Sequence, residues 1–318
     1  MGESGTISNS SSPSGYALGP PWLFRGRALY QLHLVKADIA RALIPKELKL
    51  VEAFGYHLIC VTYVTRYTLG GLFLAHYDDS PAGEFDELVV IPGIVWNPPT
   101  SCAWASRVLV NSHEACRHGR KEIGLPSQVA IFSKRDTAAS EQPLCKCRTS
   151  SIHPKPKEQS EIQVLEMEDS SQIFICNISL PFAAGDNRMG PQIRISLPSF
   201  SGQTIYNPRL LKYSCQVDCR VRAVEAAKIS RPRTTQLNEF PNATEVKKIN
   251  FDDRLTTENE ERERSIEVLL SKPILALEFS LLKMQVEAPT DVTTQSRSKK
   301  NQVVDLRTCE VSIAWFGT

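Results

Sequence analysis

A short segment with regularly placed glycine, proline, charged and hydroxyl residues is the most informative chemical feature of the chain. It reads Gly119-Arg-Lys-Glu-Ile-Gly-Leu-Pro-Ser-Gln-Val-Ala130 and leads into an apolar stretch typical of a strand. Ser127 and Gln128 carry neutral hydrogen-bonding groups, and Arg120 carries a permanent cation. Glu87 supplies a carboxylate further upstream. None of these four side chains can form an imine with a carbonyl compound, so amine-based catalysis is not expected from them.

Glu87 and Arg120 match positions retained in the family that the 119–130 segment resembles, the acetoacetate decarboxylase superfamily, and this resemblance admits two interpretations. In the functional one they face each other in a pocket, with Glu87 as acid–base and Arg120 as electrostatic stabiliser. In the structural one they form a buried pair that fixes the surrounding segment. Ser127 lacks a Gly-x-Ser-x-Gly elbow and a nearby histidine partner, so we interpret it as a lining group and not as a nucleophile. The predicted ligand-binding residues are Glu87, Arg120, Pro126, Ser127 and Gln128, whose pocket would suit an uncharged ligand with hydroxyl or carbonyl groups.

The cysteine spacing does not predict a metal centre. Cys215 and Cys219 lie on the same face of a predicted strand but about 13 Å apart, too far to chelate one ion. Cys145 and Cys147 lie in a polar stretch and would need further ligands. We therefore predict neither a metal nor a cofactor, and we interpret the nine cysteines as reduced thiols.

Length and composition are those of an ordinary globular protein. The chain has 318 residues, of which 42% are hydrophobic and 23% charged. Its net charge of +2 argues against nucleic acid as the main partner, because counterion-driven binding needs clustered basic charge. No apolar run reaches the roughly 18 residues of a transmembrane helix. We predict a disordered tail over residues 1–19 and one domain over residues 20–318.

Strand patterns dominate the predicted domain. Apolar and polar residues alternate from Leu211 to Ala223, which predicts a long strand with one dry face. Tyr56 to Thr65 is apolar on both faces and predicts a central strand. Further strands are predicted at Leu29–Val35, Leu88–Trp96, Val129–Lys134, Ile173–Leu180, Gln192–Leu197, Ile274–Val286 and Val303–Phe316. The fold class is thus mostly β with a few short helices, in a large antiparallel sheet curled into a cone or barrel or folded as a sandwich.

Two helices and two long loops complete the prediction. The helices are expected at Lys36–Leu43 and at Ser112–His118. The second is expected to be capped by Asn111 with Glu114 and stopped by Gly119. Residues 134–171 and 229–264 lack periodicity and are expected to be mobile insertions. The charge run 258–264 is expected to be a solvated face.

The 119–130 segment resembles a motif of the acetoacetate decarboxylase superfamily, approximately Gly-Arg-Glu-x-x-Gly-x-Pro-Lys-Lys before an apolar strand. Three more pieces follow the order of that family: Pro20-Pro-Trp22, Leu43-Ile-Pro-Lys-Glu-Leu48 and Gly83-Glu-Phe-Asp-Glu-Leu88. The resemblance covers residues 20–134 and implies a decarboxylase-like β-cone. In that family the first lysine of the pair forms a Schiff base and the second cation lowers its pKa. Ser127 and Gln128 stand at these positions, so the resemblance implies the fold and pocket without the reaction.

Within this superfamily the chain resembles the neoxanthin-deficiency proteins of higher plants. Pro20-Pro-Trp-Leu-Phe24, His118-Gly-Arg-Lys-Glu-Ile-Gly124 and Trp315-Phe316 carry this resemblance. It implies an accessory role in forming neoxanthin, a xanthophyll and abscisic acid precursor, without conversion of violaxanthin. The implied ligand is a xanthophyll or another apolar oxygenated small molecule, and a carotenoid-pathway protein is an alternative partner. The rival prediction is an enzyme that uses Glu87 and Arg120 for lysine-independent isomerase or lyase chemistry.

Compartment and assembly are less constrained by the sequence. The Ser-rich N-terminus has a single acid, Glu3, which is mildly typical of a plastid transit peptide, but no arginine precedes Arg25. The pathway favours a plastid, with the cytosol as the alternative, and the lack of a secretory signal predicts a protein that is not secreted. The sequence is compatible with a homo-oligomer.

Overall fold

The structure, a computed structural model, describes residues 16–55, 66–97, 100–137, 159–168, 171–180, 190–204, 206–231 and 253–292. Far more of these residues lie in strands than in helices, so the mostly β fold predicted from the sequence is confirmed. The predicted strands Tyr56–Thr65 and Val303–Phe316 lie outside the described residues, as do Cys145, Cys147 and residues 1–15.

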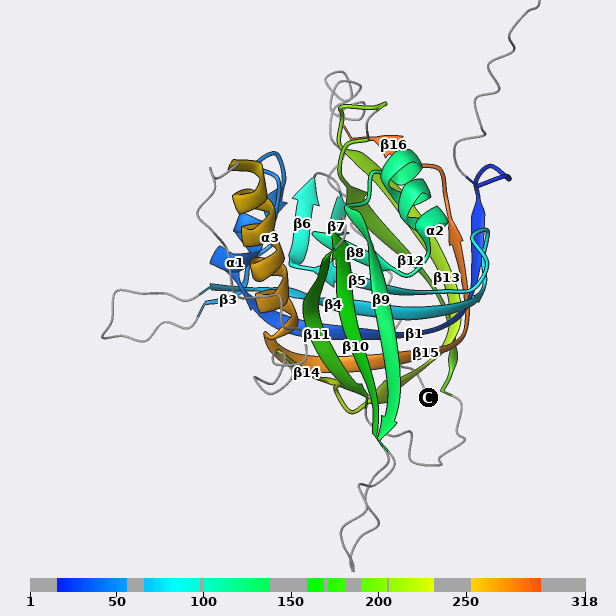
Figure 1. Cartoon of the computed structure of the whole chain (residues 1–318). Coiled ribbons are helices and arrows are strands. Elements are labelled where there is room, and N and C mark those ends of the chain that lie inside the picture. The colour runs from blue at the N-terminus through cyan, green and yellow to red at the C-terminus, as the bar shows by residue number, and fades with distance from the viewer. Residues whose placement is uncertain are drawn as a thin grey trace, which may run out of the picture.

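Long strands and a few helical elements make up the described chain (Figure 1). The helical elements are α1 (Ala37–Ala42), α2 (His113–His118), the π-helical turn η1 (Gly119–Ile123) and α3 (Asp253–Leu269). The strands are β1 (Trp22–Lys36), β2 (Lys49–Leu50), β3 (Ala53–Gly55), β4 (Arg66–Asp79), β5 (Phe85–Ile91), β6 (Gly93–Asn97), β7 (Thr100–Trp104), β8 (Arg107–Val110), β9 (Ser127–Thr137), β10 (Gln159–Glu168), β11 (Ser171–Leu180), β12 (Gln192–Ser201), β13 (Leu211–Val224), β14 (Lys228–Ser230), β15 (Lys272–Val286) and β16 (Thr290–Asp291).

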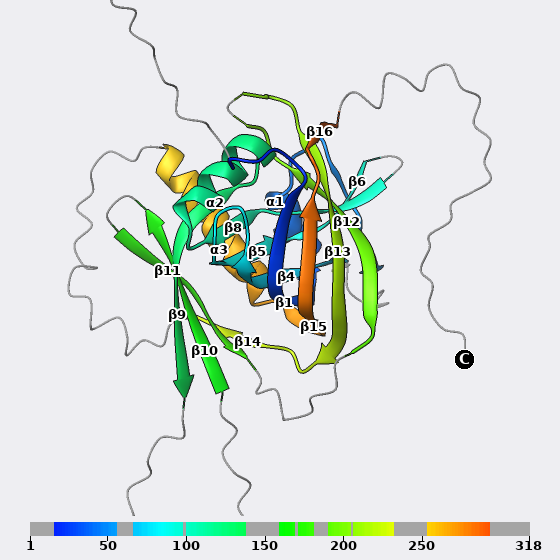
Figure 2. The same ribbon diagram turned by 90° about the vertical axis from the view of Figure 1, so that its right-hand side faces the viewer.

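All the strands belong to one curved sheet. Its order is β14-β11-β10-β9-β8-β5-β4-β1-β15-β13-β12-β7-β6-β2, with β16 added at β13 and β3 at β4. The pairing is largely antiparallel, as predicted, but β8–β9 and β7–β12 are parallel, so the sheet is mixed. Figure 2 shows β9, β10 and β11 as a wing set apart from β1, β4, β13 and β15. Among the described strands the two ends of the order, β14 and β2, do not pair, so the curve is not a closed barrel.

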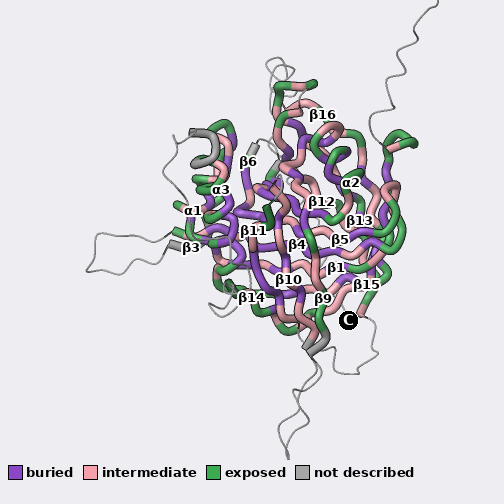
Figure 3. Tube along the Cα trace, viewed as in Figure 1, coloured by how far each residue is buried: buried purple, intermediate pink, exposed green. Residues whose placement is uncertain are grey.

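The sheet carries a hydrophobic core on each of its two faces. Figure 3 shows the buried residues gathered toward the centre of the molecule and the exposed ones at its periphery. Successive side chains of a strand point to opposite faces, so β1, β4 and β5 supply both cores. Leu72 and Leu88 belong to the first core, which α3 covers with Ile266, Val268 and Leu269. Phe24 of β1, Tyr77 of β4 and Phe85 of β5 point to the other face and belong to the second core. Adjacent residues of β4 and β5 therefore serve different faces, and this alternation positions the candidate sites.

The helix that precedes the 119–130 segment is built differently from its prediction. Ser112, and not Asn111, caps α2 by accepting a hydrogen bond from the Ala115 N–H at 3.2 Å. The Asn111 side chain instead accepts one from the Asp86 N–H at 2.7 Å, because it stands opposite the start of β5. Gly119 does not stop the helix: the chain continues into η1 and stops at Gly124, whose φ of 79° favours glycine.

The two stretches expected as loops contain regular structure. Residues 159–168 form β10 and residues 253–269 form α3. The charge run is not entirely solvated, because Arg262 is only 3% exposed and contacts Glu166 at 3.3 Å and Glu168 at 2.8 Å. Glu166 is also bound by Arg107 of β8. These ion pairs join α3 to β10, and a sequence pattern cannot show such distant partners.

Candidate functional site

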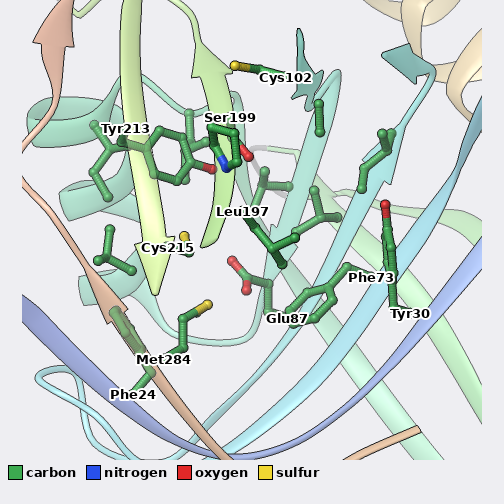
Figure 4. Close-up of a pocket in the computed structure, with 18 of the residues that line it drawn as sticks. Phe24, Tyr30, Phe73, Glu87, Cys102, Leu197, Ser199, Tyr213, Cys215 and Met284 are labelled. Atoms are coloured by element: carbon green, nitrogen blue, oxygen red, sulfur yellow. The ribbon is translucent and has the colours of Figure 1, made fainter. Parts of the chain in front are cut away.

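A cavity of about 290 Å³ lies within the second core, between the β4–β5 face and β12, β13 and β15. Its wall is almost entirely apolar or aromatic (Figure 4). The side chains that form it include Phe24, Tyr30, Phe73, Tyr77, Glu87, Val108, Ile123, Leu125, Leu197, Tyr213, Cys215 and Met284. Among the described lining residues Glu87 is the only one with a charged side chain.

Glu87 points into this cavity from the middle of β5 (Figure 4). Its Oε2 accepts a hydrogen bond from the Tyr77 hydroxyl at 2.7 Å. Burial among apolar side chains raises the pKa of Glu87 from 4.5 to about 7, and the hydrogen bond from Tyr77 partly offsets that rise. The carboxyl is therefore divided between its neutral and ionised forms near pH 7.

Two further polar groups of the wall are held neutral. Burial, followed by the nearby charge of Glu87, raises the pKa of the Cys215 thiol to about 12. Burial likewise raises the pKa of the Tyr213 hydroxyl well above its usual value. Cys215 is thus a poor nucleophile, since the thiolate is the reactive form. Glu87 is left as the group that can exchange a proton near neutral pH.

The 119–130 segment reaches the cavity through its apolar residues. Ile123 and Leu125 belong to the lining, whereas Pro126, Ser127 and Gln128 do not. The Pro126 carbonyl accepts a hydrogen bond from the Val108 N–H at 3.1 Å. Ser127 is buried at the start of β9, where the strand pairs with β8. The prediction that Pro126, Ser127 and Gln128 line the pocket is therefore wrong: the Ser127 side chain is buried against Gly119, and Gln128 Oε1 accepts a hydrogen bond from Arg120.

Arg120 does not face Glu87. Its side chain is exposed and donates hydrogen bonds to the Ser127 carbonyl and to Gln128 Oε1. Arg120 thus fixes the turn between η1 and β9. This is a structural role of the kind the second interpretation predicted, but the side-chain partner of Arg120 is Gln128 and not Glu87. The expected cation–carboxylate pair is not formed, and Glu87 is the one predicted site residue that the structure places in the cavity.

The aromatic half of the site was not predicted from the sequence. Tyr77 of β4 reaches Glu87 because β4 and β5 pair as a hairpin in which Phe85 is opposite Tyr77. Tyr213 and Cys215 were assigned to the dry face of their strand, but alternation cannot distinguish a packed core from a cavity wall. The sequence could have predicted the proximity of Tyr77 and Glu87, because Gly83 marks a hairpin turn between their two strands.

The N-terminal residues pack beside this face. The Tyr16 ring stacks on His118 with ring centroids 3.6 Å apart, and the Tyr16 backbone N–H donates a hydrogen bond to His118 Nδ1 at 3.2 Å. Burial lowers the pKa of His118 to about 4, so the ring is neutral at pH 7. Tyr16, expected in the tail, is thus held against α2.

Among the described residues no group of three or more histidine, cysteine or acidic side chains could hold a metal ion. Cys215 and Cys219 are both buried on the same face of β13. No helix in the described ranges is long and apolar enough to cross a membrane.

Comparison with known proteins identifies close relatives in plants. The chain is 54% identical over 302 residues to "Protein NEOXANTHIN-DEFICIENT 1" of Oryza sativa subsp. japonica, covering 92% of this chain and 95% of the relative. It is 55% identical to the protein of that name from Solanum lycopersicum (87% and 94% covered) and 54% identical to that from Arabidopsis thaliana (87% and 94%). These relatives confirm the resemblance predicted from the sequence. No protein-family model matches the chain.

Solved structures similar to this one share little sequence with it. An acetoacetate decarboxylase matches with a TM-score of 0.49 at 9% identity, covering 90% of this chain and 94% of that one. The acetoacetate decarboxylase of Legionella pneumophila matches with a TM-score of 0.47 at 10% identity, covering 89% and 93%. An enduracididine biosynthesis enzyme, MppR, complexed with pyruvate matches with a TM-score of 0.46 at 12% identity, covering 91% and 99%.

Proposed function

The chain belongs to the family of the NEOXANTHIN-DEFICIENT 1 proteins, and on this premise we propose that it acts in neoxanthin formation as an accessory, ligand-binding protein. The ligand is an apolar molecule with a hydroxyl or carbonyl group, held in the Glu87 cavity. A xanthophyll or a related oxygenated terpenoid has this chemistry.

The observation that carries the proposal is a single titratable carboxyl in an otherwise apolar cavity. Apolar walls favour burial of a hydrocarbon ring or chain. When protonated, Glu87 can donate a hydrogen bond to a ligand oxygen, and when ionised it can accept one from a hydroxyl. The described lining contains no lysine or arginine, so a neutral ligand fits it better than an anion.

The size of the cavity limits how much of such a ligand can enter. Its volume of about 290 Å³ lies at the lower end of the roughly 300–1,000 Å³ typical of small-molecule sites. One oxygenated ring end of a xanthophyll fits this space better than the whole pigment does. The ligand would then be bound by an end group next to Glu87.

Pigment binding can be measured with purified protein and xanthophylls, by the shift of their visible absorption spectrum. We expect a shift that weakens at least several-fold in Glu87→Leu, which can neither donate nor accept a hydrogen bond. Glu84→Gln, an exposed carboxylate on the same hairpin and outside the lining, is the matched control and should bind as the wild type does. The absence of any shift, or equal loss in the control, would contradict the proposal.

A second candidate function is an enzyme that uses Glu87 as acid–base. The pKa of about 7 favours it, because general acid–base catalysis is most efficient when the pKa lies near the working pH. The hydroxyl of Tyr77 would position the carboxyl. Turnover of an epoxy-xanthophyll that is abolished in Glu87→Gln and slowed in Tyr77→Phe would establish it. Borohydride trapping with a keto acid should give no covalent adduct, because the described cavity wall offers no amine.

Location and partners complete the proposal. A role in neoxanthin formation favours a plastid over the cytosol, and a carotenoid-pathway protein is the natural macromolecular partner. A fluorescent fusion at the C-terminus, which leaves the N-terminus free, tests the compartment directly. Fluorescence in the cytosol alone would contradict the plastid assignment.

A further inference from the structure

The opposite face of β1 and β4 lines a second cavity, which the proposed function does not use. Its volume is about 460 Å³, and its lining comes from these strands, from β9, β10 and β11 of the wing, and from β13 and β15. Apolar side chains form its floor: Leu29, Leu74, Phe132, Ile162 and Leu180. The volume lies within the range of small-molecule sites, roughly 300–1,000 Å³.

A row of polar side chains borders this floor. Asp86, His76 and Arg27 are directly opposite one another on β5, β4 and β1. Asp86 Oδ1 accepts hydrogen bonds from His76 Nδ1 and from Lys134 Nζ, each at 2.8 Å. Asp86 Oδ2 accepts one from the Asn111 amide at 3.2 Å. Both oxygens of this buried carboxylate are therefore occupied, and the carboxylate orients the donors around it.

The unused hydrogen-bonding capacity of this border consists mainly of donors. Lys134 donates to Asp86 with one of its three N–H groups, and 43% of its side chain is exposed. Arg27 is exposed and has no hydrogen bond or ion pair with another described residue. Across the cavity Glu278 is bound by Arg222 at 2.6 Å, so of the lining carboxylates only Glu225 has no described cation next to it.

We propose that this cavity is a second ligand site, which binds an amphipathic monocarboxylate with its apolar chain on the Leu29–Leu74 floor and its carboxylate between Arg27 and Lys134. Charge-assisted hydrogen bonds from these two cations recognise the head group. The floor supplies affinity through apolar burial. The site shares no lining residue with the Glu87 cavity, so it is independent of the proposed function.

Titration calorimetry of the purified full-length protein with dodecanoate and with dodecanol tests this site. We expect dodecanoate to bind at least about tenfold more tightly than the alcohol. Arg27→Gln and Lys134→Gln should each weaken dodecanoate several-fold and leave dodecanol unchanged. Leu74→Trp should block both ligands by filling the floor. Arg194→Gln, which removes an 80% exposed cation on β12, is the matched control and should have no effect.

Three results would overturn the proposal. The first is equal affinity for dodecanoate, dodecanol and dodecylammonium, because no head group would then be recognised. The second is loss of dodecanoate binding in Glu87→Gln but not in Lys134→Gln, which would place the ligand in the first cavity. The third is normal binding to a folded Leu74→Trp protein. If that variant does not fold, Leu180→Trp at the partly exposed margin of the floor replaces it, and unhindered binding there has the same meaning.

Discussion

Replacing Glu87 by glutamine should make the protein more stable at alkaline pH. The pKa of Glu87 is about 7 in the folded protein and 4.5 ordinarily. Between these values the folded protein keeps a proton that the unfolded chain has released, so stability falls as pH rises through this window. One pH unit corresponds to about 1.4 kcal/mol, so the carboxylate costs about 3 kcal/mol once the pH exceeds the folded pKa. Glu87→Gln removes this cost and still offers an oxygen to the Tyr77 hydroxyl.

His118 contributes a pH dependence of opposite sign, so the variant must be compared with the wild type at each pH. Its pKa is lowered from 6.5 to about 4 by burial. Between these values the unfolded chain binds a proton that the folded protein does not, so stability rises with pH there. The two contributions nearly cancel in the wild type between pH 4.5 and 6.5. The difference between Glu87→Gln and wild type isolates the Glu87 contribution.

The assay is urea unfolding followed by far-ultraviolet circular dichroism at half-unit steps from pH 5 to pH 8.5. The stability gained by Glu87→Gln should grow from about 1 kcal/mol or less at pH 5 to about 3 kcal/mol at pH 8.5. Glu84→Gln on the exposed part of the hairpin should give a flat difference near zero. A flat difference for Glu87→Gln as well, or a gain that grows toward low pH, would refute a buried, proton-holding carboxyl.

Two other substitutions test how the sites are positioned. Gly124→Ala should destabilise the fold by more than about 2 kcal/mol, because it combines a positive φ with a carbonyl oxygen 2.5 Å from the added Cβ. Gly83→Ala has a similar φ with no atom within 4 Å and should cost only about 1 kcal/mol in the same urea assay, so equal costs would contradict the contact. Arg262→Ala should cost about 3–5 kcal/mol, because it leaves Glu166 buried with one partner fewer. Glu267→Ala on the exposed side of α3 should stay within about 0.5 kcal/mol, and a similar small effect of Arg262→Ala would show that the buried charge is solvated.

Sequence patterns predicted the positions of β1, β9, β11, β12, β13 and β15, because each has a dry face that must be apolar. β13 is the plainest example, with Cys215, Val217 and Cys219 buried on one face. The strands β4, β7 and β8 were not predicted, and the single strand predicted at Leu88–Trp96 is divided into β5 and β6. The same rule failed for β10, where Ile162 and Val164 are buried between acidic and polar residues whose charge masked the pattern. Glu166 breaks the rule outright, because a buried charge is tolerated only next to its counter-ions.

The candidate site was half predicted for a related reason. Motif spacing located the segment that packs against the cavity and the carboxylate that enters it. Spacing does not fix side-chain direction, however. Ser127 and Gln128 start a strand that pairs in parallel with β8, where Ser127 is next to the cavity-lining Val108. Ser127 does not reach the cavity because its side chain is buried against Gly119 of η1, and Gln128 is bound by Arg120. The register of a parallel pair is set by the connection between its strands, here the turn through η1 and Gly124, whose conformation no periodicity shows.

Two neighbouring carboxylates on β5 show what the structure adds to the sequence. Asp86 and Glu87 differ by one methylene and one position, yet alternation sends them to opposite faces of the sheet. Asp86 is held by Lys134 and His76 and acts as a fixed anchor. Glu87 has a hydroxyl partner and apolar neighbours, so its pKa rises and its proton becomes exchangeable. Residues of the β4–β5 hairpin line both cavities. If the two faces are coupled through this hairpin, dodecanoate should change the pH dependence of the stability difference between Glu87→Gln and wild type. If the hairpin is rigid, dodecanoate should leave that difference unchanged.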